Sequence, residues 1–138
     1  MIVTEAQAVL AELAASTSAA QVEVGTSGRP PHDYAYLKLT SASNPDDYAI
    51  VSTPGVGWFE LEVTGGFRTG RADDLATDEE VREYVEYYLR AAIAYLGGHR
   101  STGKSRFFRI PFVTVQTEDA KLKLVLSVRA DLKHIFKL

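Results

Sequence analysis

One stretch of the chain has the residue types and spacing of a nucleotide phosphate loop. Residues 98–105 read Gly-His-Arg-Ser-Thr-Gly-Lys-Ser, which fits the pattern G-x-x-x-x-G-K-S. A phosphate loop binds its anion because it follows a buried strand and opens a helix, whose amide groups and dipole face the phosphates. Here the sequence predicts a helix before the stretch and a strand after it, so the helix dipole has the wrong sense. We therefore expect a connecting loop at residues 98–105.

The other residue types that could do chemistry predict neither a metal site nor a catalytic group. His32, His99 and His134 are far apart in the sequence, and no H-x-x-x-H pair is present. The chain has no cysteine, which excludes a disulfide, a thiolate ligand and a cysteine nucleophile. No serine stands in a nucleophile elbow. We expect a protein that is not an enzyme and that uses no metal or other cofactor.

Acidic residues are numerous, and some of them accompany an aromatic residue. Trp58, Glu60 and Glu62 alternate with apolar residues in one strand-like segment, so they share its outward face. An aromatic side chain among carboxylates suits a protein-binding surface, and the alternative is a plain solvated face. Asp73 and Asp74 follow in a polar, acidic stretch. These five residues are the candidate partner-binding residues.

Charge is distributed unevenly along a chain whose net charge is -3. Residues 1–59 carry six acids and two bases, residues 60–86 nine acids and three bases, and residues 90–138 three acids and ten bases. This asymmetry predicts an acidic and a basic region, which would influence the choice of partner and the encounter rate. The alternative is that the two regions neutralise each other across one sheet.

Part of the basic region mixes cations with an aromatic residue. Four bases lie near Phe107 in the sequence: Arg100, Lys104, Arg106 and Arg109. Such a group can grip phosphates and stack a base. Because the chain is acidic overall and has no nucleic-acid-binding motif, we do not expect a nucleic-acid partner.

Length and composition predict one globular domain over residues 1–138. A chain of this size buries about two-thirds of the surface that it exposes when unfolded, which is enough for one core. No apolar stretch approaches the roughly 20 residues that span a bilayer. The first residues lack the basic segment and apolar run of a signal peptide. We expect a cytoplasmic protein without a membrane partner.

Hydrophobic periodicity predicts an α+β fold. A helix is expected over residues 4–16, where Thr4 and Gln7 form a capping box. Strands are expected near residues 22–24 and over 34–40, 48–53 and 58–64. Turns rich in Gly, Pro, Ser, Asn and Asp separate them.

The second half of the chain contains the strongest helical pattern. Thr77 and Glu80 form a capping box, and an apolar stripe that includes Ile93 continues to Leu96. A strand from Phe108, with a bulge at Pro111, and a return strand over residues 122–128 should form a hairpin. Residues 131–138 predict a short C-terminal helix. The expected architecture is a mainly antiparallel sheet of about six strands, with the long helix packed across it and a helix at each terminus.

The stretch from residue 58 to residue 126 resembles the small actinobacterial immunity proteins that accompany polymorphic secreted toxins. The resemblance comprises an aromatic strand at Trp58, an acidic lead-in, a long helix with Tyr84 and Tyr88, a glycine break followed by Arg100, and a strand with Arg109-Ile110-Pro111. It covers about half the chain, and residues 1–57 add nothing to it. The resemblance implies a non-catalytic protein that neutralises one toxin by covering or plugging its active site.

Three functional hypotheses follow. The first is an immunity protein whose partner is a secreted toxin domain. The second, from another class, is a small enzyme or nucleotide-binding module that uses residues 98–105, or a small module that binds nucleic acid. The third is a chaperone or adaptor for a secreted partner, which would differ from an immunity protein by releasing its client.

Overall fold

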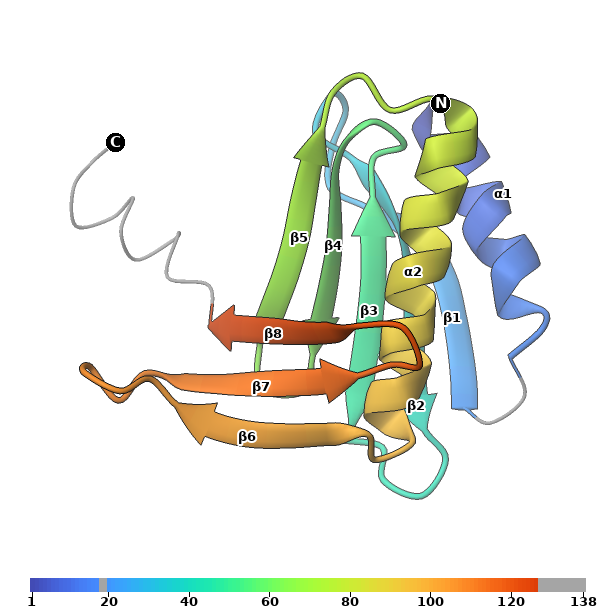
Figure 1. The fold of residues 1–138 in the computed structure, drawn as a ribbon. Coiled ribbons are helices and arrows are strands. Elements are labelled where there is room, and N and C mark those ends of the chain that lie inside the picture. The colour runs from blue at the N-terminus through green and yellow to red at the C-terminus, as the bar shows by residue number, and fades with distance from the viewer. Residues whose placement is uncertain (18–19, 127–138) are drawn as a thin grey trace.

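The computed structural model describes residues 1–17 and 20–126. This part of the chain forms an α+β fold with two helices and a single eight-stranded sheet (Figure 1). The elements, in chain order, are α1 (Val3–Ala14), β1 (Ala20–Ser27), β2 (Tyr34–Ser41), β3 (Tyr48–Thr53), β4 (Gly57–Val63), β5 (Phe67–Asp73), α2 (Asp78–Leu96), β6 (Arg100–Lys104), β7 (Pro111–Gln116) and β8 (Lys121–Leu126). The expected C-terminal helix over residues 131–138 lies outside the described residues.

The sheet is antiparallel throughout, with the strand order β1-β2-β3-β4-β5-β8-β7-β6. Strands β1 to β5 form a meander, because each is joined to the next by a short turn. Strand β8 joins this meander through the pairs Phe67 with Leu126 and Arg68 with Val125. The β6–β7–β8 group therefore runs across the direction of the first five strands (Figure 1).

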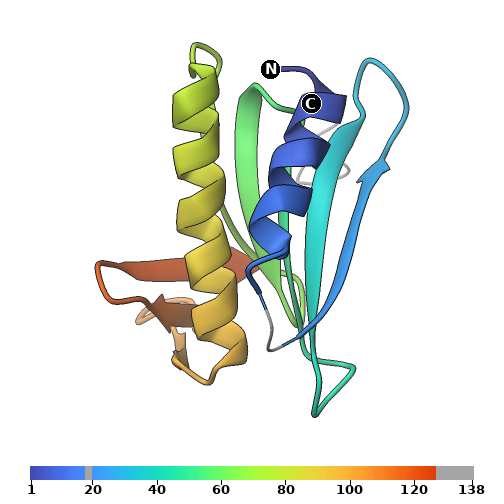
Figure 2. The same cartoon turned by 90° about the vertical axis from the view of Figure 1, so that its right-hand side faces the viewer.

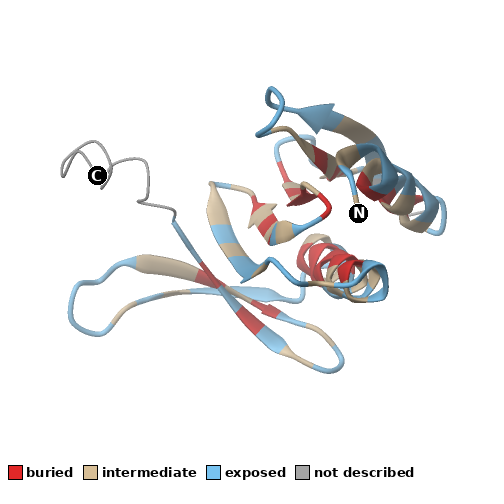
Figure 3. Ribbon diagram, turned by 90° about the horizontal axis from the view of Figure 1, so that it is seen from above, coloured by how far each residue is buried: buried red, intermediate tan, exposed pale blue. Residues whose placement is uncertain are grey.

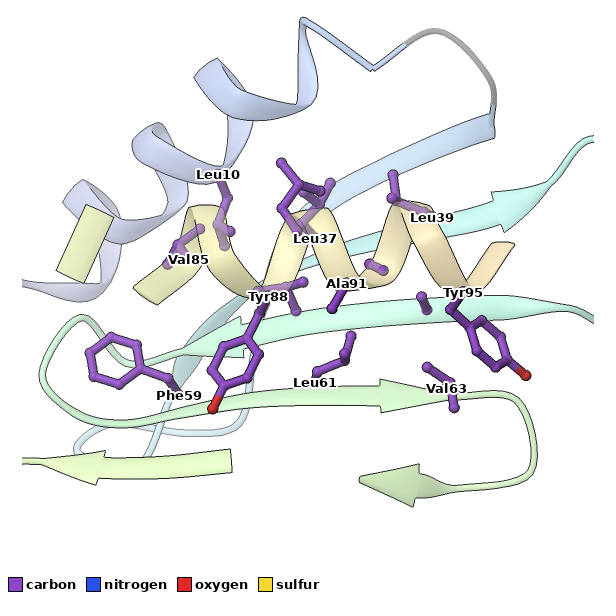
Figure 4. Close-up of a cluster of buried hydrophobic side chains, with 14 of the residues drawn as sticks. Leu10, Leu37, Leu39, Phe59, Leu61, Val63, Val85, Tyr88, Ala91 and Tyr95 are labelled. Atoms are coloured by element: carbon purple, nitrogen blue, oxygen red, sulfur yellow. The ribbon is translucent and has the colours of Figure 1, made fainter. Parts of the chain in front are cut away.

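Both described helices cover the same face of the meander, so within residues 1–17 and 20–126 no helix covers its other face, which we call the helix-free face (Figure 2). Helix α1 packs on β1 and β2, while α2 packs on β2, β3, β4 and β7. The buried residues lie between the sheet and the helices (Figure 3), and Figure 4 shows Phe59, Leu61 and Val63 of β4 pointing towards α2. Burial of this apolar layer is the main stabilising term of the fold.

Helix α2 forms as the sequence predicts at its N-terminus. The Thr77 hydroxyl accepts a hydrogen bond from the Glu80 amide (3.2 Å), and the Glu80 carboxylate accepts one from the Thr77 amide (3.1 Å). Val81, Val85 and Leu89 are buried as expected. Ile93 is exposed, because the buried stripe is centred on the tyrosine side of the helix, where Tyr88 and Tyr95 pack into the core.

Loss of the Thr77 hydroxyl is expected to lower the free energy of unfolding by about 1 kcal/mol. Thr77→Ala leaves the Glu80 amide without its acceptor at the start of the longest helix. Chemical denaturation measures this loss, provided that the slope of the unfolding free energy against denaturant concentration is the same for both proteins. Thr77→Ser keeps the acceptor and should retain most of the stability, so a serine variant as unstable as the alanine variant would argue against this role.

The capping box expected at Thr4 is absent. Helix α1 begins at Val3 with Ile2 as its N-cap, and no side chain caps it. The Ile2 carbonyl accepts a hydrogen bond from the Ala6 amide (3.0 Å), so Thr4 already lies inside the first turn and is not the cap. The N-terminal ammonium group of Met1 forms an ion pair with Asp78 (3.2 Å), the first residue of α2. Leu10 of the predicted apolar stripe is fully buried.

The sheet has two strands that the sequence does not predict, β5 and β6. The predicted start of β7 is also wrong, because Phe108 and Ile110 lie in the loop before it. Pro111 is the first residue of β7 and lies opposite Lys104, so no bulge forms at this point. The apparent change of phase arises at Arg109, which has a left-handed φ of 52° and redirects the chain within the loop.

An ion pair joins the β2–β3 turn to the start of β6. The Arg100 guanidinium donates a hydrogen bond to the Asp47 carboxylate (2.9 Å), and the Thr64 hydroxyl donates a second (2.6 Å). Arg100 also lies over the ring of Tyr95 on α2, with 4.1 Å between the guanidinium carbon and the ring centroid. The β6–β7–β8 group is thereby fixed to the meander at a second place.

Candidate functional site

The helix-free face of the meander contains a hollow of 440 Å³, which we call the outer hollow. Strands β1 to β5 all contribute to its lining, and the lining residues are Glu23, Thr26, Ser27, Tyr34, Tyr36, Lys38, Ile50, Ser52, Trp58, Glu60, Glu62 and Arg68. Its volume falls in the range of ligand-binding clefts. It is the candidate functional site because tyrosine, tryptophan and carboxylate side chains converge on it.

The alternation of β4 divides its residues between core and hollow. Phe59, Leu61 and Val63 are buried against α2, so the residues between them point to the outer face. Trp58, which the sequence predicted to point outward, is 36% exposed and lines the hollow together with Glu60 and Glu62. The predicted outward orientation of these three side chains is confirmed.

Residues with small side chains lie at the middle of the hollow and leave space above the strands. Tyr36 lies opposite Gly25 on β1 and Ser52 on β3, while Glu60 lies opposite Gly70 on β5. A side chain at Gly25 would place its Cβ 2.9 Å from the Tyr36 hydroxyl oxygen, and one at Gly70 would meet the Phe59 carbonyl oxygen at 2.8 Å. The two glycines therefore let neighbouring groups lie close over the strands, and the space between them stays open.

One end of the hollow is aromatic. The rings of Tyr34 and Trp58 lie 5.4 Å apart in an edge-to-face arrangement. Such a pair contributes about 0.5–1.5 kcal/mol in addition to the free energy gained from burying its apolar surface. Each ring packs against the other, so a ligand that contacts both would lose less side-chain entropy on binding.

Tyrosine hydroxyl groups hold the carboxylates on both sides of the hollow. The Tyr36 hydroxyl donates to Glu23 (2.7 Å), and the Tyr48 hydroxyl donates to Glu62 (3.0 Å). The hydrogen bond to Glu23 raises the pKa of Tyr36, whereas burial, followed by the bond to Glu62, raises the pKa of Tyr48. Both tyrosines therefore stay protonated at neutral pH and remain hydrogen-bond donors.

The cations of the hollow are engaged with neighbouring groups. Arg68 forms ion pairs with Glu62 (2.5 Å) and Glu60 (3.4 Å), and the Lys38 ammonium group lies 5.4 Å from the centroid of the Tyr48 ring. Three carboxylates and two cations line the hollow, so its formal charge is negative. This net negative charge attracts cationic groups.

The outer hollow has the chemistry of a binding site. Ser52 is its buried hydroxyl, and no histidine is among the lining residues. Within the described residues, no group of three or more His, Asp or Glu could hold a metal ion, and no buried side-chain nitrogen or oxygen lacks a partner. The arrangement can stack, hydrogen-bond and pair with a cation.

The other two candidate residues lie elsewhere. Asp73 is on the helix-covered face, where it accepts a hydrogen bond from the Tyr84 hydroxyl (2.7 Å) and raises the pKa of that tyrosine. Asp74 is exposed in the connection between β5 and α2. Because Gly57 pairs with Asp73 and Trp58 with Ala72, Asp73 has the opposite orientation to Trp58. The structure therefore does not group these two acids with the hollow.

Residues from β1, β2 and β5 complete a site of which the sequence predicts only the part on β4. Glu23, Tyr34, Tyr36 and Arg68 reach the hollow through the register of three hairpins. The alternation of Tyr34, Tyr36 and Lys38 with buried residues was a usable signal. What the sequence lacked was the strand order that places these side chains beside β4.

The stretch that fits the phosphate-loop pattern lies mainly in β6. Residues 100–104 pair with β7 in an antiparallel ladder, and a helix precedes them. Gly98 adopts a left-handed φ of 89°, and the amides of Gly98 and His99 bond back to the last turn of α2. The stretch therefore lacks the strand-to-helix geometry that cradles phosphates.

Comparison with known proteins gave no relative for this chain: no protein family, curated protein or solved structure matches it. Among the described residues, neither helix is long and apolar enough to cross a membrane. His32 is exposed between β1 and β2, His99 is exposed between α2 and β6, and His134 lies outside the described residues.

Proposed function

We propose that this chain is a non-catalytic binding protein that docks a basic protein segment in the outer hollow, and that it acts as an immunity protein. Its partner would be a toxin domain whose active site it covers. Two things support this proposal: the sequence resemblance to small immunity proteins over residues 58–126, and the chemistry of the outer hollow.

The observation that carries the proposal is the position of three carboxylates beside a packed pair of aromatic rings on the face of the meander opposite the two described helices. An arginine or lysine side chain can lie over Trp58 or Tyr34 and at the same time face Glu60. Because hydroxyl groups and Arg68 already hold the neighbouring carboxylates, little side-chain entropy would be lost on binding.

The sign of the charge favours one class of toxin. Domains that bind or cleave nucleic acid attract their substrate with a positive surface, and such a surface would also attract the outer hollow. Occupation of that surface by this protein would compete directly with the substrate. The same carboxylates would repel the phosphates of a nucleotide or nucleic acid, which argues against the alternative of a nucleic-acid-binding module.

Co-expression with the product of the adjacent gene is the direct test. An immunity protein should form a stable complex on gel filtration and protect the host from the toxin. The absence of both complex and protection would overturn the proposal. A complex that dissociates once the partner has folded or been exported would instead favour a chaperone.

Trp58→Ala is expected to weaken the partner complex about thirtyfold, because a well-packed interface tryptophan contributes about 2 kcal/mol or more. Titration calorimetry with the purified partner gives the dissociation constant. Leu75→Ala is the matched control, because Leu75 is 90% exposed in the β5–α2 connection and does not line the hollow. Equal affinities of the Trp58 and Leu75 variants would place the interface elsewhere.

A further inference from the structure

The loop between β6 and β7 projects beyond the rest of the sheet (Figures 1 and 3). Three hydrogen bonds close its backbone into a turn. The Ser105 amide donates to the Ile110 carbonyl (2.8 Å), the Arg109 amide to the Ser105 carbonyl (3.0 Å) and the Ile110 amide to the Ser105 hydroxyl (2.9 Å). We call residues 105–110 the apex.

The closed turn points large apolar side chains into solvent. Phe107 is 86% exposed and Phe108 is 83% exposed, and Ile110 beside them is also exposed. Leaving these side chains in water forgoes the stabilisation that burial of a phenylalanine provides, about 1.5–3 kcal/mol for each. Adjacent apolar residues with this exposure indicate a contact surface.

The charged residues that flank the apex in the sequence have a single sign. Lys104, Arg106 and Arg109 are all exposed there, and residues 100–117 contain no acid. Glu118 and Asp119 lie in the β7–β8 turn at the opposite end of this hairpin, where Asp119 is 3.9 Å from Arg90 of α2. The apex therefore combines an apolar tip with a collar of cations.

We infer that the apex docks on an anionic phospholipid surface, with Phe107 and Phe108 inserted at the level of the headgroups and the three cations on the lipid phosphates. Insertion of apolar side chains together with attraction of nearby bases is the physical basis of peripheral membrane binding. This inference is independent of the function proposed for the outer hollow.

The shape of the apex favours lipid over the other anionic partners. Sites for single-stranded nucleic acid are grooves in which aromatic rings succeed one another along a basic track. Here the tip is a projecting turn, and Ile110, which offers no ring for a base, belongs to its apolar surface. A bilayer interface accommodates such a tip without a complementary pocket.

A membrane partner was not expected from the sequence, because that expectation concerned signal peptides and spanning segments. Docking at the headgroup level needs neither. It needs exposed apolar side chains on a projecting turn, and the extent of their exposure becomes visible only in the structure.

Flotation with vesicles tests the inference. The protein is mixed with vesicles of phosphatidylcholine alone, or of phosphatidylcholine and phosphatidylglycerol in equal parts, and the floating fraction is measured at low and high salt. We expect flotation with the anionic vesicles that decreases with salt. The double variant Phe107→Ser/Phe108→Ser should lower the partition coefficient at least tenfold, and Arg106→Gln should lower it about fivefold.

Matched controls lie elsewhere on the surface. Leu75→Ser removes an apolar side chain that is more exposed than either phenylalanine, and Arg29→Gln removes one exposed cation far from the apex in the sequence. Both controls should float like the unmodified protein. The inference would be overturned if the protein floated with neither vesicle type or equally with both. It would also be overturned if the double serine variant floated like the unmodified protein. A dimer on gel filtration that the double serine variant alone abolishes would overturn it as well, because the apex would then bind a second copy.

Discussion

Replacing Arg100 by methionine is expected to lower the free energy of unfolding by about 2–4 kcal/mol at neutral pH, because the change leaves a buried carboxylate without its main partner. The side chain of Asp47 is only 11% exposed, whereas that of Arg100 is 35% exposed. The expected loss is therefore somewhat smaller than for a pair buried on both sides. Chemical denaturation of both proteins is the measurement.

The pH dependence of this loss has a definite sign. The hydrogen bond from Arg100, and to a smaller extent the one from Thr64, lowers the pKa of Asp47, although burial opposes them. A lowered pKa in the folded state contributes stability above the ordinary aspartate pKa of about 4, and this contribution is lost as the pH falls through the folded value. The stability difference between the two proteins should shrink when the pH falls below about 4.

The double variant Asp47→Asn/Arg100→Met separates the ion pair from the packing of the long side chain. Without a buried charge, this protein should be more stable than Arg100→Met alone. If the double variant loses as much as the sum of the two single variants, the two side chains do not interact, and the proposed second attachment of β6 is wrong.

The elements that the sequence predicted well have patterns that are local in the chain. The capping box of α2 and its apolar repeat both lie within residues 77–96, and the alternation of β4 lies within seven residues. Local hydrogen bonds and a single buried face decide such elements, so one segment contains the necessary information.

The missed strands depend on contacts from other parts of the chain. Strand β5 reads FRTGRAD and β6 reads RSTGK, both with a glycine and without a repeating apolar residue. Strand β5 is ordered by a seven-pair ladder with β4, and β6 by a five-pair ladder with β7. Pairing with a neighbour overrides the weak preference of these segments, and a single sequence does not show which neighbour it will be.

The candidate site was predictable only along one strand. Trp58, Glu60 and Glu62 share a face because side chains alternate along β4, which the sequence shows directly. Tyr34 reaches Trp58 from a strand that is not adjacent to β4, because β3 lies between them. That contact requires the strand order and the twist of the sheet, and neither can be read from residue spacing.

Adjacent residues of β4 should have opposite roles, and Phe59→Ala tests this with the largest expected loss of stability, about 3–5 kcal/mol. Phe59 is 2% exposed, and its ring lies 4.6 Å from that of Tyr84 on α2. Truncation leaves a cavity between the sheet and the helix that the surrounding core cannot fill completely. Thermal and chemical denaturation both measure the loss.

Trp58→Ala is the matched variant on the other face. This variant should lower the free energy of unfolding by about 1 kcal/mol, mainly through the loss of the contact with Tyr34. It should also reduce the affinity for the partner. The folded fraction of Phe59→Ala should bind the partner with nearly normal affinity, because the outer hollow does not include Phe59. If both variants lost stability equally and binding equally, the helix-free face would be part of the structural core, and a separate binding surface on it would be ruled out.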